Sequence, residues 1–317
     1  MINTEQLNFE NLLVQLEADD YPIGQYGAMM HIYETQCAYT TIYQNLMSEA
    51  LINQSDQGKS DTMTLIGFLT KLIDGLIHLI VTGIKKLVMI FKRFSARAKD
   101  VYMNNTEFLK KYGARLNKIK DVMVNVEGYS MSNSNIIAKA TMVGSESEYI
   151  FDAAKMIILE GKPYFSSHND IDRKINKTRL KILESSNSSL VDSNNSFREA
   201  VKRKYYGDFK TRTYAVYEAL DHMARYESSL SSVKSANELA VKQGNHDIEE
   251  LNRLKRLMKG NSMYRNTREL VEQFNMLSKY RTQTMQDCIY VFETVMRYID
   301  DTNLQAKAIC ILALQQN

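Results

Sequence analysis

The residues best suited to catalysis or metal binding are spread thinly through this sequence. The five histidines stand apart from one another, and none belongs to an H-E-x-x-H pattern or a comparable ligand set. The acidic pairs Glu249–Glu250 and Asp300–Asp301 are consecutive residues, and consecutive side chains on a helix do not face one another. Glycine-rich phosphate-binding motifs are also missing from the sequence. We therefore predict a non-enzymatic protein, while a catalytic site assembled from distant residues stays open.

The three cysteines, Cys37, Cys288 and Cys310, are far apart and lack the paired spacing of a zinc site. Cys288 and Cys310 have apolar neighbours, so we expect both thiols to pack as small hydrophobic side chains in a reducing compartment. The sequence accordingly indicates no metal and no cofactor, and no small-molecule substrate is evident from it.

Charge is distributed unevenly along the chain. Residues 1–61 contain nine acidic side chains and one base, Lys59, whereas residues 62–120 contain twelve bases and three acids. Two blocks of opposite sign are therefore adjacent in a chain whose net charge is only +3. This asymmetry is typical of an intramolecular contact, of a surface that binds an anionic partner, or of both. For residues 62–120, DNA and an anionic membrane are the partners that this charge would suit.

A long amphipathic helix is predicted to begin near Asp61 or Thr62, because its apolar residues recur at spacings of three and four. The residues expected to supply its apolar contact are Leu76, Ile80, Ile84, Leu87 and Phe91. The residues expected to contact an anionic partner are Lys85, Lys86, Lys92, Arg93 and Arg97. Lys71 and Asp74 interrupt the apolar run, and each would cost roughly 2.5–3.5 kcal/mol near the centre of a bilayer. We therefore expect no membrane span, which leaves packing in a bundle or binding at a membrane surface.

The fold class is predicted to be mainly α: a helical bundle with long amphipathic helices and a small β element near residues 119–129. Proline is nearly absent and glycine is sparse, so long helices meet few interruptions. Valines alternate with polar residues over 119–129, which is typical of a strand. A new helix is expected at Phe108 after a cap at 104–107, and further helices are predicted over 146–160, closed by Gly161, and over 265–314.

Four regions are predicted along the chain. Residues 1–61 form an acidic helical N-terminal segment, and residues 62–184 form the basic amphipathic helix with a small α+β region. Residues 185–196 are rich in serine and asparagine and are expected to form a linker or surface loop. Residues 197–317 are expected to form a helical bundle, with helix nearly to the end of the chain.

Two stretches of the sequence, 65–94 and 104–129, carry a resemblance when they are taken together. The first is the apolar and basic helix, and the second is a helix that leads into a strand ending in Gly128-Tyr129. This order resembles virion-associated proteins, often internal head proteins, of large tailed bacteriophages. The resemblance implies a structural or packaged protein that is made in the host cytoplasm, enters the virion and binds other virion proteins or itself. Internal head proteins are often trimmed by a maturation protease, and an acidic prosegment at residues 1–61 would suit such trimming.

A second class of function stays open. A membrane-active protein, pore-forming or toxin-like, could be held soluble by an acidic segment that covers its basic amphipathic helix. The same charge asymmetry supports both hypotheses, so the sequence by itself does not choose between them.

Overall fold

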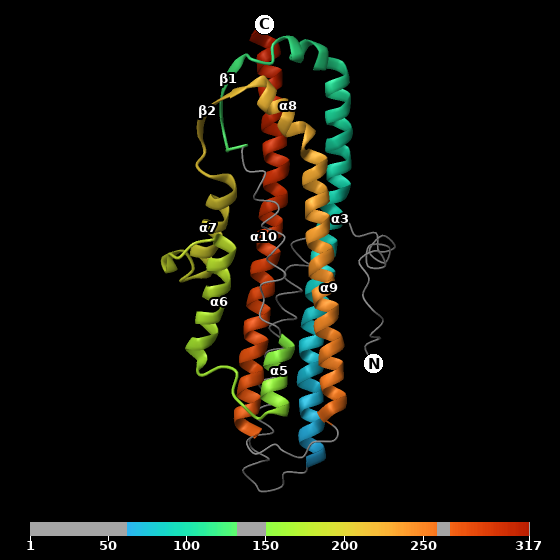
Figure 1. Ribbon diagram of the computed structural model, residues 1–317, viewed down its shortest axis with the longest axis vertical. Helices are drawn as coiled ribbons and strands as arrows, with labels where there is room; N and C mark the ends of the chain where they lie inside the picture. The colour runs from blue at the N-terminus through green and yellow to red at the C-terminus, as the bar shows by residue number, and fades with distance from the viewer. Residues whose placement is uncertain (1–61, 132–149, 259–266, 317) are drawn as a thin grey trace. The chain divides into compact units, whose positions relative to one another are not determined.

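The predicted mainly α fold is confirmed by a computed structural model, which describes residues 62–131, 150–258 and 267–316 (Figure 1). The acidic segment 1–61, and with it the predicted mask or prosegment, lies outside these residues. The described helices are α3 (Thr62–Lys118), α5 (Ile150–Leu159), α6 (His168–Leu183), α7 (Asn194–Tyr206), α8 (Val216–Ala224), α9 (Tyr226–Met258) and α10 (Thr267–Gln316). Two strands, β1 (Met123–Gly128) and β2 (Lys210–Ala215), pair antiparallel.

The chain folds into two compact units, and each of them combines segments that are far apart in the sequence. Unit 1 takes its described residues from 1–88, 146–178 and 240–287, and unit 2 takes them from 89–145, 179–239 and 288–317. The helices α3, α9 and α10 each contribute residues to both units. This division cuts across the four predicted regions, because composition along a chain does not show which distant segments pack together.

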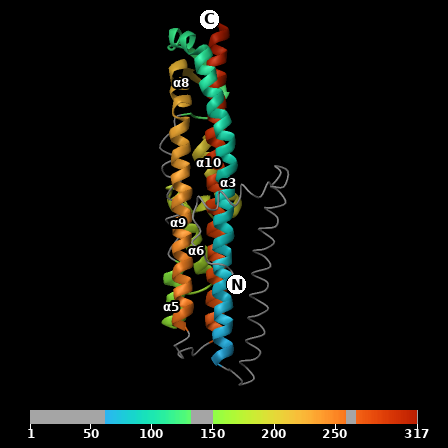
Figure 2. The ribbon, with the colours of Figure 1, turned by 90° about the vertical axis from the view of Figure 1, so that its right-hand side faces the viewer.

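Unit 1 contains three helix segments that contact one another in pairs (Figures 1 and 2). Gly83 of α3 faces Met285 of α10, where an added Cβ atom would lie 2.8 Å from the methionine side chain. Gly244 of α9 faces Ile84 of α3, and an added Cβ atom there would collide with the isoleucine. The third pair, α9 with α10, is joined by the buried ion pair between Asp247 and Arg281. Glycine thus permits close approach at two of the three contacts.

A glutamine of α10 fixes the loop that precedes α6 in unit 1. The side-chain oxygen of Gln273 accepts hydrogen bonds from the backbone N–H groups of Tyr164 and Phe165, both at 2.9 Å. Its amide nitrogen donates to the Phe165 carbonyl at 2.8 Å. The predicted helix stop is confirmed nearby, since α5 ends at Leu159 and Gly161 has a φ of 60°, a conformation that favours glycine.

Unit 2 contains the two-stranded sheet, whose register runs from Met123 opposite Ala215 to Gly128 opposite Lys210. The first strand falls within the predicted range 119–129. The second strand was predicted as part of a helical region, and that prediction is wrong. The residues of β2 alternate polar with apolar only weakly, so its strand conformation depends on pairing with β1. Behind the sheet, Leu116, Val124, Val216 and Ile309 belong to one buried hydrophobic cluster.

The structure corrects one local prediction and adds detail to two others. The helix α3 continues through residues 104–107 without a break, and Asn105, which was expected to cap a new helix, lies buried inside it. The helical stretch after β2 is divided at Arg225, where α8 ends and α9 follows. Residues 185–196 form a surface loop within unit 2, with a short 3-10 turn and the N-cap of α7, where Ser193 accepts a hydrogen bond from the Ser196 N–H.

Candidate functional site: the basic face of α3 and a groove between α7 and α10

The predicted apolar face of α3 is buried inside the fold. Exposed fractions do not exceed 5% for any of the five predicted contact residues, which are Leu76, Ile80, Ile84, Leu87 and Phe91. The helix therefore uses this face for its own core, as the bundle interpretation expects. A partner could reach these side chains only if the helices separated. Their predicted role in binding a partner stays a prediction.

The predicted basic contact residues of α3 differ in how much surface they offer. Lys85 and Arg97 are exposed, Lys92 and Arg93 are half-buried, and Lys86 is buried. Lys86 lies at the border of the apolar face, where its long aliphatic stem is covered by neighbouring groups. Arg97 is already engaged, because its Nε atom lies 3.0 Å from a carboxylate oxygen of the buried Asp300. These five residues therefore do not form one continuous, exposed basic surface.

A more uniform basic surface follows on α3 within unit 2. Five basic side chains between residues 99 and 118 are exposed: Lys99, Lys110, Lys111, Arg115 and Lys118. We call these five residues the α3 basic face. The last three are spaced by four and three residues, which places them on one side of the helix. On the other side, Leu116 is fully buried in the hydrophobic cluster of unit 2, so packing turns the basic side toward solvent.

The C-terminal part of α10 organises unit 2 through polar side chains. Asp300 accepts a hydrogen bond from the Tyr226 hydroxyl of α9 at 2.8 Å, and Asp301 accepts one from the Tyr206 hydroxyl of α7 at 2.9 Å. Asn303 accepts a hydrogen bond from the Asn105 side chain of α3 at 2.8 Å. Burial raises the pKa of Asp300, against the opposing effects of Tyr226 and Arg97. Three closely spaced residues of α10 thus form hydrogen bonds with three different helices, α9, α7 and α3.

A second glutamine fixes the loop that follows β1. Gln305 of α10 accepts a hydrogen bond from the Tyr129 N–H and donates one to the Tyr129 carbonyl, both at 2.8 Å. The Tyr214 hydroxyl donates a further hydrogen bond to the same carbonyl at 2.9 Å. Gly128 is needed for this contact, because a Cβ atom at that position would collide with the Gln305 side chain. These hydrogen bonds hold the backbone of Tyr129 in place and therefore fix the position from which its ring extends.

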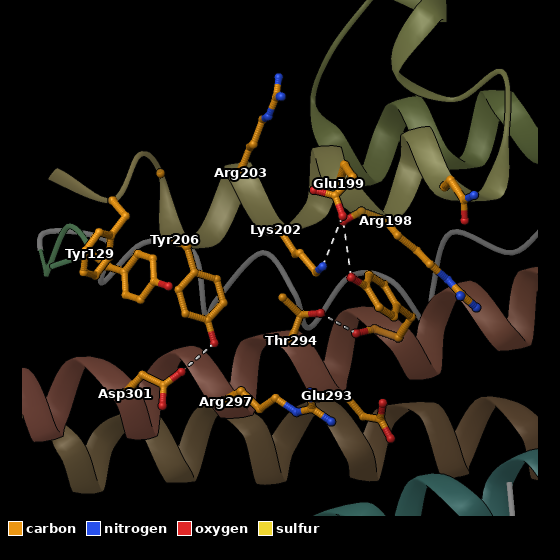
Figure 3. A pocket seen from close by; sticks show the side chains of 14 residues that line it. Tyr129, Arg198, Glu199, Lys202, Arg203, Tyr206, Glu293, Thr294, Arg297 and Asp301 are labelled. Atoms are coloured by element: carbon orange, nitrogen blue, oxygen red, sulfur yellow. Dashed lines mark hydrogen bonds and ion pairs between the residues drawn. The ribbon is translucent and has the colours of Figure 1, made fainter. Parts of the chain in front are cut away.

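The ring of Tyr129 lies at one end of a groove between α7 and α10 (Figure 3). The groove has a volume of about 780 Å³, which is within the range of small-molecule sites. All of its lining residues belong to unit 2. Four of these residues are basic (Arg198, Lys202, Arg203 and Arg297) and three are acidic (Glu199, Glu293 and Asp301).

The charges in the groove are not fully paired with one another. Lys202 contacts Glu199 at 3.1 Å, and the hydrogen bond from this carboxylate raises the pKa of the lysine. Arg297 makes no ion pair with any residue in the described part of the chain. Burial raises the pKa of Glu293 while Arg297 opposes that shift, and the Oε1 atom of Glu293 is buried with no hydrogen-bond partner there. Figure 3 shows Lys202 extending toward α10 and Arg203 pointing away from it.

Aromatic side chains form the end of the groove at which Tyr129 lies. The ring of Tyr129 contacts the rings of Tyr206 and Phe209 edge to face, with centroid distances of 4.6 and 5.0 Å. Phe209 keeps 59% of its surface exposed. Its position depends on Gly207, which ends α7 with a φ of 62° and a ψ of −156°, a conformation that only glycine adopts without strain. Burial and the Asp301 hydrogen bond raise the pKa of Tyr206, so its hydroxyl stays protonated.

The sequence reasoning missed this groove, although part of its pattern is visible in the sequence. Tyr290, Thr294, Arg297 and Asp301 recur at spacings of four, three and four on α10, so they share one helical face. A face with these residue types also fits ordinary solvent exposure. The aromatic end has no local signal at all, because Tyr129 lies far from α7 and α10 in the sequence.

No protein family, curated protein or solved structure matches this chain. In the stretches that the structure describes, no helix has the length and apolar character needed to cross a membrane. Those stretches also contain no group of three or more His, Cys, Asp or Glu side chains placed to hold a metal ion. Cys288 and Cys310 are buried thiols, which confirms the prediction that both pack inside the fold, and burial raises the pKa of Cys310 to about 11.

Proposed function

We propose that this chain is a non-enzymatic assembly protein whose α3 basic face binds the phosphate backbone of duplex DNA. The observation that carries the proposal is the row of exposed bases Lys99, Lys110, Lys111, Arg115 and Lys118, which only Asp100 and Glu107 offset between residues 99 and 118. Lysine and arginine on such a surface displace the counterions of DNA without reading its sequence. A helix also holds these charges in a rigid row.

The resemblance to internal head proteins of tailed bacteriophages supports a virion setting, in which a packaged protein lies against the genome. Helical surfaces would supply contacts with other virion proteins or with further copies of the chain. The membrane-active alternative is less well supported, since the apolar face that it needs is buried. If the full-length protein floats with anionic vesicles, the membrane-active function becomes better supported than the DNA-binding function.

The DNA proposal is tested by retention of the full-length protein on duplex DNA at increasing salt concentration. We expect the variant with Lys110, Lys111, Arg115 and Lys118 all changed to Glu to lose retention. The logarithm of the binding constant should also become less salt-dependent, by about 0.9 units of slope for each phosphate contact removed. A variant with the same change in net charge at other exposed bases is the control: Lys155, Lys177, Lys242 and Arg256 to Glu. If the two variants lose DNA retention equally, the loss follows from the change in net charge alone, and this result would contradict the proposal.

The virion setting is tested separately, by mass spectrometry of purified phage particles from the source. Abundant peptides of this chain in the particles are expected, and a mature N-terminus near residue 62 would identify residues 1–61 as a removed prosegment. If the chain is not found in the particles, the virion proposal fails even where DNA retention is observed.

A further inference from the structure

We propose that the groove between α7 and α10 is a nucleotide-binding site, with the phosphate held by Arg297 and Lys202 and the base placed against Tyr129 and Phe209. This site is independent of the DNA proposal, because none of its lining residues belongs to α3. It is also formed without any glycine-rich phosphate loop. The inference rests on the cations and the aromatic rings that share this groove.

The first step is the surplus of positive charge in the middle of the groove. Glu199 is engaged by Lys202, and Asp301 accepts the hydrogen bond from Tyr206. Arg297 is left without an ion pair among the described residues, and the guanidinium of Arg198 lies over the Tyr290 ring at 5.2 Å. A guanidinium that makes no ion pair is well suited to a phosphate, since its donors match the phosphate oxygens in geometry.

The second step is the distance from these cations to the aromatic end. Arg297 and Asp301 are one helical turn apart on α10, about 6 Å along the axis, and Asp301 holds the Tyr206 hydroxyl. The rings of Tyr129, Tyr206 and Phe209 therefore begin about one turn along α10 from the backbone of Arg297, whose side chain extends toward Glu293 (Figure 3). In a nucleotide, one sugar ring separates the phosphate from the base, which is a separation of the same order. Exposed aromatic rings bind bases of any sequence by stacking.

The test is calorimetric titration of the full-length protein with AMP, ribose 5-phosphate and adenosine, which separate the two halves of the ligand. We expect AMP to bind at least about tenfold more tightly than either half, since phosphate and stacking contacts combine. A 5′-phosphorylated oligodeoxyadenylate identifies the source of the nucleotide. If AMP binds and the oligodeoxyadenylate does not, the ligand of the groove is a free nucleotide. If both bind, the ligand is the 5′ end of a nucleic-acid strand.

Two variants assign the contacts. Arg297→Gln should weaken AMP about tenfold or more and leave adenosine unchanged. Phe209→Ala should weaken AMP and adenosine and leave ribose 5-phosphate unchanged, and this exposed loop position keeps the test available if Arg297→Gln fails to fold. The matched control is Arg225→Gln, an exposed arginine of unit 2 that contacts Asp221 outside the groove, and its AMP affinity should equal that of the wild type.

Three results would overturn the assignment: no saturable AMP binding, AMP no tighter than ribose 5-phosphate, or an unchanged AMP affinity in Arg297→Gln. The two proposals fail separately. Charge reversal of the α3 basic face should abolish DNA retention without altering the affinity for AMP, and Arg297→Gln should leave the DNA retention of the protein unchanged.

Discussion

The helices α3 and α10 contact each other in both units, but the chemistry of the contact differs between them. In unit 1, Gly83 lets the Met285 side chain approach α3 closely, and the surrounding α3 residues are aliphatic and fully buried. In unit 2, the same two helices are joined by Asn105 with Asn303 and by Arg97 with Asp300. One pair of helices thus has an apolar contact and a polar contact.

This difference shows how a helix pair can combine stability with a defined orientation. Apolar contact gains free energy from burial but constrains the relative rotation of the helices weakly. Hydrogen bonds between buried side chains are directional, and leaving one partner unsatisfied is costly, so they select one orientation. In unit 2 that orientation directs Asp301, Arg297 and Glu293 of α10 toward the groove. We therefore expect function in unit 2 to depend on the polar contacts.

The largest effect is expected from breaking the buried ion pair of unit 1. Asp247→Ala removes the carboxylate that the buried Arg281 guanidinium contacts, which should lower the free energy of unfolding by about 3–5 kcal/mol. Arg97→Ala in unit 2 removes a cation that is 62% exposed, and the buried Asp300 keeps its hydrogen bond from Tyr226 and can be protonated, so the cost should be smaller, about 1–3 kcal/mol. Urea denaturation measures both. If both variants lose the same free energy of unfolding, the two ion pairs are equally solvated and this difference between the two units does not exist.

The next effect concerns the polar contact of α3 with α10 in unit 2. Asn303→Ala should lower the free energy of unfolding by about 1–3 kcal/mol, because the buried Asn105 amide loses its partner. The double variant Asn105→Leu/Asn303→Leu should recover most of that loss, since neither position is then polar. Its nucleotide affinity should nevertheless stay below that of the wild type if the pair orients α10. A double variant with full affinity would show that the pair is not needed for orientation.

A smaller effect separates two of the glycines of α3, Gly113 and Gly83. Gly113→Ala in unit 2 meets no atom within 4 Å, so the better helix propensity of alanine should stabilise the protein by about 1 kcal/mol. Gly83→Ala in unit 1 gains the same propensity but pushes against Met285, so its net effect should be smaller or destabilising. Thermal melting of both variants tests the difference. Equal stabilisation would mean that Met285 moves aside without cost.

The smallest effect is a pH dependence in the groove. Burial raises the folded-state pKa of Glu293, so between about pH 4, the ordinary value of a glutamic acid, and that raised value, the folded state binds more protons than the unfolded state. Stability therefore falls as pH rises across this window. Glu293→Gln removes the titration, so its melting temperature relative to the wild type should rise with pH and then level off. A difference that is constant with pH would contradict the raised pKa.

The apolar periodicity of α3 was enough to predict its buried side. The residues at spacings of three and four, such as Leu76, Ile80 and Ile84, are all fully buried. The same reasoning predicted the stripe of α10, where Phe274, Phe292 and Ile309 are buried. It failed at Asn105, which looked like a helix cap, because a polar residue inside a helix is stable there only with a partner such as Asn303, 198 residues away.

The sequence by itself determined the helical class, the long amphipathic helices, the first strand and the uneven charge, because these depend on residue types at short, regular spacings. Only the tertiary structure decided which bases face solvent, that β2 is a strand, and that Tyr129 meets α7 and α10 at one groove. Those outcomes depend on contacts between residues far apart along the chain, such as the one between Gln305 and Tyr129. Such contacts form only when the segments pack together, so the local sequence pattern does not predict them.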